Sequence, residues 1–145
     1  MLEVSVNRLW EVVSMIKWKA VSVGIVVVVV LGLLLQLAFT SIVVGQIELS
    51  RNYPEYSSTI KAIPYLVGFG GFFLVMAIGG YVTASIALTR VVLNALVVGA
   101  VTAGISLWLS VSGGEVKLMS LIFLILGVAF CISGALLWRA RQRSL

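Results

Sequence analysis

Hydrophobic residues fall into four long blocks, separated by short polar segments. The blocks cover residues 20–46, 63–87, 91–110 and 118–138. A helix needs about 20 apolar residues to cross the hydrocarbon core of a bilayer. Runs such as VGIVVVVVLGLLL lack the alternation of apolar and polar positions that strands of a membrane barrel show. The pattern predicts an all-α integral membrane protein with four transmembrane helices in a single domain.

Arg90 is the only charged residue between Lys61 and Glu115. The apolar stretch around it, residues 63–110, is too long for one span and suits two. An arginine at the bilayer centre costs about 2.5–3.5 kcal/mol, whereas an arginine at a turn extends its head to the lipid headgroups. We therefore expect a turn near residues 84–91. A functional charge inside the membrane is the alternative.

The segment before the first block, residues 2–18, has the periodicity of an amphipathic helix. Its apolar residues recur at steps of three and four, and polar residues occupy much of the remainder. Such a helix fits the membrane interface, where apolar burial and basic residues hold it. Docking against a partner subunit is an equally open reading of this face.

Basic residues predict the orientation, because cytoplasmic segments of membrane proteins are enriched in Lys and Arg. With both termini in the cytoplasm, seven basic residues lie inside and three outside. The inside set is Arg8, Lys17, Lys19, Arg90, Arg139, Arg141 and Arg143. The outside set is Arg51, Lys61 and Lys117. We also expect every residue of the inside set except Arg8 to contact lipid headgroups.

Small residues recur at steps of about four within the blocks. Such spacing lets helix backbones approach closely in lipid. The candidate helix-packing residues are Gly80, Ala84, Ala87, Gly99, Ala103, Gly127, Cys131 and Ala135. Packing within the chain and packing against another subunit both fit this pattern.

Few polar residues interrupt the blocks. Gln36 and Asn94 carry the largest uncharged polar groups, and Thr102 and Ser106 follow in the third block. Hydrogen bonds between helices account for them. The alternative is functional: these four residues would line a hydrophilic pathway through the membrane.

The composition is informative mainly because of the functions that it argues against. The chain is 61% hydrophobic and 10% charged, and its net charge is +5. It has no histidine, one cysteine, and no acidic residue inside any block. We therefore predict no enzymatic activity, cofactor or metal. The basic excess lies at the termini, which suits membrane lipid as a partner and not nucleic acid.

The stretch GFFLVMAIGGYVTASIALTRVVLNALVVGAVTAG contains Gly79, Gly80, Tyr81 and Ala84, followed by Gly99, Ala103 and Gly104. It resembles a GGY-x-A hairpin of small four-helix prokaryotic membrane proteins of uncharacterised function. The resemblance implies a four-span protein and a bacterial or archaeal plasma membrane. It carries no activity with it.

Three functions remain open from the sequence. The first is a non-catalytic accessory or scaffold subunit of a larger membrane complex, which contacts other subunits through the amphipathic segment and the second and third spans. The second is a small homo-oligomeric channel or transporter. The third is a membrane-surface adaptor that acts through the amphipathic segment and the arginine-rich tail.

Overall fold

The fold is entirely helical in the part of the chain that the structure, a computed structural model, describes: residues 14–112 and 118–144. Four α-helices and one short 3-10 helix occupy these residues, and no strand is present among them. Residues 2–13 of the expected amphipathic helix lie outside the described residues. Residues 15–17 form a turn and a bend before the first long helix.

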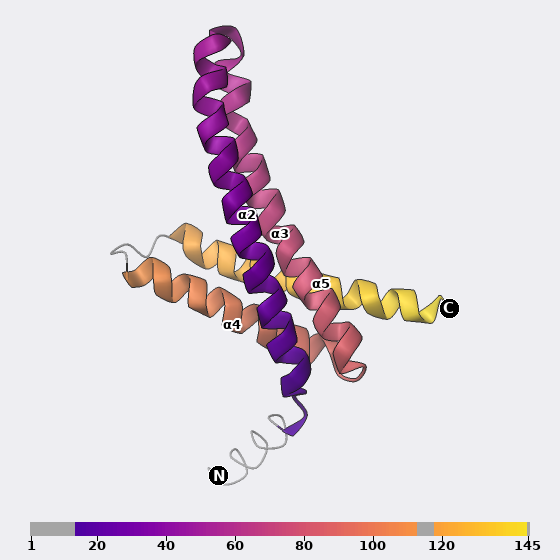
Figure 1. The fold of residues 1–145 in the computed structure, drawn as a ribbon. Helices are drawn as coiled ribbons and strands as arrows, with labels where there is room; N and C mark the ends of the chain where they lie inside the picture. The colour runs from indigo at the N-terminus through magenta and orange to yellow at the C-terminus, as the bar shows by residue number, and fades with distance from the viewer. Residues whose placement is uncertain (1–13, 113–117, 145) are drawn as a thin grey trace.

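Two helices form a long antiparallel hairpin (Figure 1). Helix α2 spans Trp18–Asn52, the 3-10 helix η1 spans Pro54–Tyr56, and α3 spans Ser57–Ala87. The polar segment between the first two apolar blocks, residues 47–62, is therefore mostly helical, and both helices run beyond the predicted spans. Hydropathy marks where apolar residues end, whereas a helix continues as long as its backbone hydrogen bonds do.

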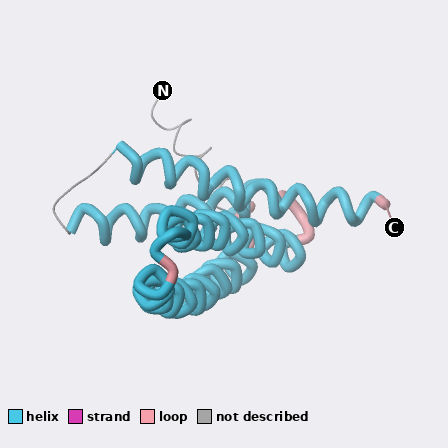
Figure 2. The backbone as a smooth tube through the Cα atoms, turned by 90° about the horizontal axis from the view of Figure 1, so that it is seen from above, coloured by secondary structure: helices cyan, strands magenta, loops and turns pink. Residues whose placement is uncertain are grey.

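The second hairpin consists of α4, Val91–Ser112, and α5, Leu118–Arg143. It crosses the first hairpin steeply, so the four helices do not form a parallel bundle (Figure 1). Figure 2 shows α2 and α3 nearly end-on while the other hairpin runs across them. Helix α2 begins, α3 ends and α4 begins close together, and from there the hairpins diverge in a V. Helix α5 crosses α3, and its C-terminal part runs on beyond the crossing (Figure 1).

Three helices are long and apolar enough to cross a membrane: α2, α3 and α5. Helix α4 is also apolar, but its stretch counted here, Val91–Ile105, is shorter. The chain is thus compatible with an integral membrane protein. Helix α2 is rich in valine, a poor helix former in water. In lipid the backbone must satisfy its own polar groups, and this requirement favours helix regardless of side chain.

The core lies where the hairpins cross, and backbone contacts between α3 and α5 form its centre. A Cβ added at Gly80 would overlap the carbonyl oxygen of Cys131, and one added at Gly134 would overlap that of Ala77. Only glycine permits this approach. Next to it, Phe69 and Phe73 of α3 stack on Phe123 and Phe130 of α5, with ring centroids 5.0 and 4.4 Å apart respectively.

Candidate functional site

The turn between α3 and α4 is tight and centred on Arg90. Helix α3 ends at Ala87 and α4 begins at Val91, the residues that the sequence predicts. Leu88 and Arg90 have positive φ, 58° and 48°, which closes the reversal in three residues without glycine. Arg90 is exposed at this turn. The prediction of a turn is therefore confirmed, and Arg90 does not lie within either helix.

Asn94 holds the turn together with the start of α2. Its Nδ2 donates to the carbonyl oxygens of Thr89 and Arg90, at 3.4 and 3.2 Å. Its Oδ1 accepts from the backbone N–H of Lys17, at 2.9 Å. The side chain is fully buried. Asn94 is thus a structural connection between three elements, and its position gives no support to a role in lining a pore.

Basic side chains gather at this shared end of the two hairpins. Asn94 joins Lys17 to Arg90, and Arg141 Nη1 lies 3.4 Å from the hydroxyl of Tyr81 on α3. We call the set the basic end: Lys17, Lys19, Arg90, Arg139, Arg141 and Arg143. The described acidic residues, Glu48 and Glu55, lie at the far end of the α2–α3 hairpin. The basic end is consequently a region of uncompensated positive charge within the described structure.

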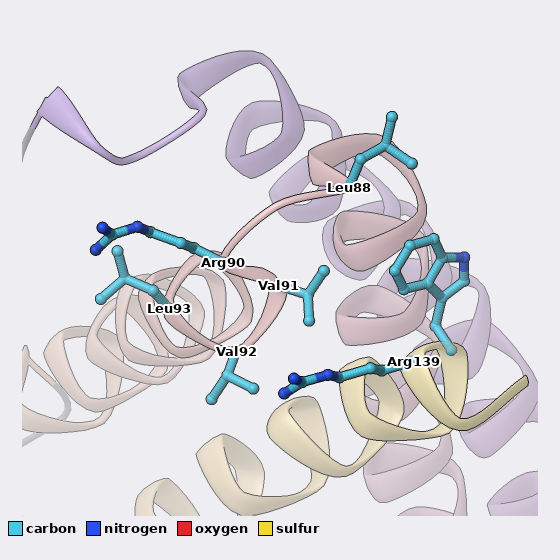
Figure 3. Close-up of a pocket in the computed structure, with 7 residues that line it drawn as sticks. Leu88, Arg90, Val91, Val92, Leu93 and Arg139 are labelled. Atoms are coloured by element: carbon cyan, nitrogen blue, oxygen red, sulfur yellow. The ribbon is translucent and has the colours of Figure 1, made fainter. Parts of the chain in front are cut away.

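A hollow of about 300 Å³ opens at the basic end. Its lining includes Arg90 at the turn and Arg139 on α5, and both side chains are exposed. The remaining lining is apolar: Leu88, Val91, Val92, Leu93 and Trp138. Figure 3 shows the Arg139 side chain extending from α5 toward Val92 on the first turn of α4. The Arg90 side chain extends away from that of Arg139, over α4, so the hollow has one cationic head group beside apolar residues.

The candidate helix-packing residues are buried without exception. They are Gly80, Ala84, Ala87, Gly99, Ala103, Gly127, Cys131 and Ala135. Gly99 faces Val128 and Cys131 of α5, and Gly127 faces Phe72 and Met76 of α3. The structure thus uses these glycines for contacts within the chain. A surface for another subunit has to lie elsewhere.

A second hollow, here called the groove, lies between the arms of the V and has a volume of about 360 Å³. Helices α2, α3 and α4 line it, and its surface is mainly apolar. Gln36 and Thr102 are its polar members. Thr102 is buried, and its hydroxyl donates to the carbonyl oxygen of Val98 at 2.7 Å. Gln36 is exposed.

Gln36 and Gly32 distinguish the groove from the packed core. No hydrogen bond is recorded for the side-chain amide of Gln36 in the described part of the chain, although its backbone oxygen accepts from Thr40 at 2.9 Å. A Cβ added at Gly32 would meet no atom within 4 Å. The side chain of Ser106, the fourth residue of the expected pathway, lies outside what the structure describes.

Neither hollow carries the groups that catalysis ordinarily requires. No carboxylate, histidine or cysteine lines them in the described structure. No cluster of three or more potential metal ligands occurs among residues 14–112 and 118–144. What these surfaces can do is attract anions, at the basic end, and accept an apolar segment with one hydrogen bond, in the groove.

Comparison with protein-family models, curated proteins and solved structures finds no match to this chain. The resemblance of the second and third spans to a GGY-x-A hairpin therefore stays an expectation. Sequence reasoning named Arg90 and Arg139, and it grouped Gln36 with Thr102, which both line the groove, but it did not predict either hollow. It had no signal for them, because the hollows join residues from helices far apart in the chain.

Proposed function

We propose that this chain is a non-catalytic accessory subunit of a membrane protein complex, and that its groove receives a transmembrane helix of a partner. The observation that carries the proposal is the side-chain amide of Gln36. It stands in the apolar groove and makes no hydrogen bond with the residues that the structure describes. An unbonded amide in hydrocarbon is costly, and a polar side chain on a partner helix removes that cost.

The shape of the groove supports a helix as its occupant. Between α2, α3 and α4 the described residues leave a hollow of about 360 Å³ unfilled. Gly32 has open space above its Cα, and Ala103 beside it is small. Small residues at a helix crossing permit close backbone approach, which is the main source of helix affinity in lipid.

The proposed topology has four membrane-crossing helices, with both termini in the cytoplasm of a bacterium or archaeon. The bilayer normal then runs between the two arms, and each hairpin is tilted. Tilt explains the length of α2, whose 35 residues extend about 52 Å against about 30 Å of hydrocarbon. The basic end lies on the cytoplasmic side, as the enrichment of Lys and Arg there requires.

The test is co-purification of the tagged chain from its native membrane in mild detergent, with intact-complex mass spectrometry to count subunits. Gln36→Leu removes the amide and keeps most of the volume. Gly32→Leu fills the groove. Gly45→Leu is the matched control, because it is the same change on the same helix and its added Cβ also meets nothing within 4 Å.

We expect Gln36→Leu and Gly32→Leu to release the partner, and Gly45→Leu to retain it at the stoichiometry of the parent chain. Retention by both groove variants would contradict the proposal. Purification of a fixed homo-oligomer without any partner would instead favour the channel hypothesis, and ion flux in vesicles would then be measured.

A further inference from the structure

We propose that the partner helix carries an asparagine or glutamine in the half of the bilayer remote from the basic end, and that this amide pairs with Gln36. The inference rests on the proposed function and names the chemistry of the helix that the groove receives. It comes from two properties of Gln36. One is the hydrogen bonds that its side chain lacks among the described residues, and the other is its distance along α2 from the lysines of the basic end.

The side chain of Gln36 has both a donor and an acceptor to satisfy, because a primary amide offers two N–H bonds and a carbonyl oxygen. Asn94 of α4 uses both parts of its amide: Nδ2 donates to two backbone carbonyls, and Oδ1 accepts from the Lys17 N–H at 2.9 Å. The hydroxyls of Thr40 and Ser41 donate to carbonyl oxygens one turn back on α2, at 2.9 and 3.0 Å. The amide of Gln36 has no such partner in the described structure.

A second amide is the side chain that satisfies both parts of Gln36. Two primary amides can face each other and exchange two N–H···O=C hydrogen bonds. A hydroxyl on a helix commonly donates to its own backbone, as that of Ser41 does, so it leaves the carbonyl oxygen of Gln36 without a donor. A carboxylate only accepts, lysine and arginine only donate, and the charge of each is costly within the bilayer. Asparagine or glutamine is therefore the complement of this groove.

The position of Gln36 along α2 sets the depth of the partner's amide. Gln36 comes 17 residues after Lys19, which places it about 26 Å farther along the helix axis. At a tilt of about 40°, the upper end of the range for membrane helices, the distance along the bilayer normal is still about 20 Å. The hydrocarbon core is about 30 Å thick, so Gln36 lies beyond its midplane as counted from the basic end. The partner's amide has to lie in the same half.

The experiment co-expresses the full-length chain with single-span probe helices in a bacterial membrane, and measures how much probe co-purifies in mild detergent. The probes are leucine–alanine helices with a lysine flank, which stays on the same side as the basic end. One probe has a glutamine in the half remote from the flank, one has it in the half beside the flank, and one has no polar residue. The test variant is Gln36→Leu. Ser41→Leu is the matched control, because Ser41 is an exposed polar residue of the same helix outside the groove.

We expect the parent chain and Ser41→Leu to retain the probe with the remote glutamine about tenfold more than either other probe. Gln36→Leu should lower its retention to that of the apolar probe. Equal retention of all three probes would overturn the amide pairing, and release of all three by Gly32→Leu would then leave the proposed partner helix in place. Preference for the glutamine beside the flank would overturn the assigned depth.

The native partner provides a second measurement. An asparagine or glutamine in the remote half of its contacting span, whose replacement by leucine releases the chain, is the expected result. A partner that depends on the groove but has no such residue overturns this inference and keeps the accessory role. A dimer of the parent chain alone that Gln36→Leu dissolves would assign the groove to Gln36 of a second copy, and would overturn the pairing with a separate partner.

Discussion

The backbone N–H of Lys17 donates a 2.9 Å hydrogen bond to Oδ1 of Asn94, a residue 77 positions later in the chain. The same side chain donates to the two carbonyl oxygens that end the α3–α4 turn. One buried amide thus joins the first residue before α2 to the turn that places Arg90. The basic end owes its geometry to this connection.

Replacing Asn94 with leucine should destabilise the fold by about 2–3 kcal/mol. The change leaves the Lys17 N–H and the Thr89 carbonyl without their partner at a part-buried site, and each such loss costs about 1–3 kcal/mol. Thermal unfolding in detergent, followed by circular dichroism, measures the loss. Leu96→Ala on the same helix is the control, since Leu96 is 43% exposed and should change stability by less than about 0.5 kcal/mol. Equal stability of both variants would remove Asn94 from this structural role.

Two glycines of α3 should respond in opposite directions to alanine. A Cβ at Gly80 overlaps the backbone of Cys131, which cannot move aside, so Gly80→Ala should cost about 3 kcal/mol or more. A Cβ at Gly70 meets nothing within 4 Å, so Gly70→Ala should stabilise the helix by about 0.5–1 kcal/mol. Unfolding midpoints of the two variants in one detergent test this. A tolerated Gly80→Ala would contradict the close crossing of α3 and α5.

Much of the fold follows from the sequence, because hydropathy locates spans and a single arginine locates a turn. The helix boundaries at Ala87 and Val91 come directly from that reasoning. The helical extension through Asn52 does not, since polar residues continue a helix as readily as they end one. Pro64 also falls inside α3, although proline ordinarily interrupts a helix.

The relation between the hairpins could not be predicted from the sequence. Small residues at 80 and 131 indicate close packing, but the spacing does not say which helix each one meets or at what angle. The position of Arg139 beside the first turn of α4 depends on that angle, as does the groove beside Gln36. Pairwise contacts across 40 or more residues leave no periodic signal in a single sequence.

Leu88→Gly should stabilise the protein by about 1 kcal/mol. Leu88 follows the last residue of α3 with φ 58° and ψ −31°, a conformation that costs an L-residue about 1–2 kcal/mol and suits glycine. Thr89→Gly is the control, because Thr89 does not have a positive φ and should gain nothing. Unfolding midpoints in detergent distinguish the two. A loss of stability in Leu88→Gly would show that its side-chain contacts outweigh the backbone strain.

The orientation is tested by labelling single cysteines with a membrane-impermeant maleimide on intact cells, in a Cys131→Ala background. The basic end carries six Lys and Arg residues without a described carboxylate, whereas Glu48 and Glu55 accompany Arg51 and Lys61 at the η1 end. Positive segments stay in the cytoplasm. We therefore expect Glu55→Cys to react from outside and Ser144→Cys to react only after permeabilisation. The reverse labelling would invert the topology, and reaction of both on intact cells would require an even number of membrane crossings between them instead of the proposed three.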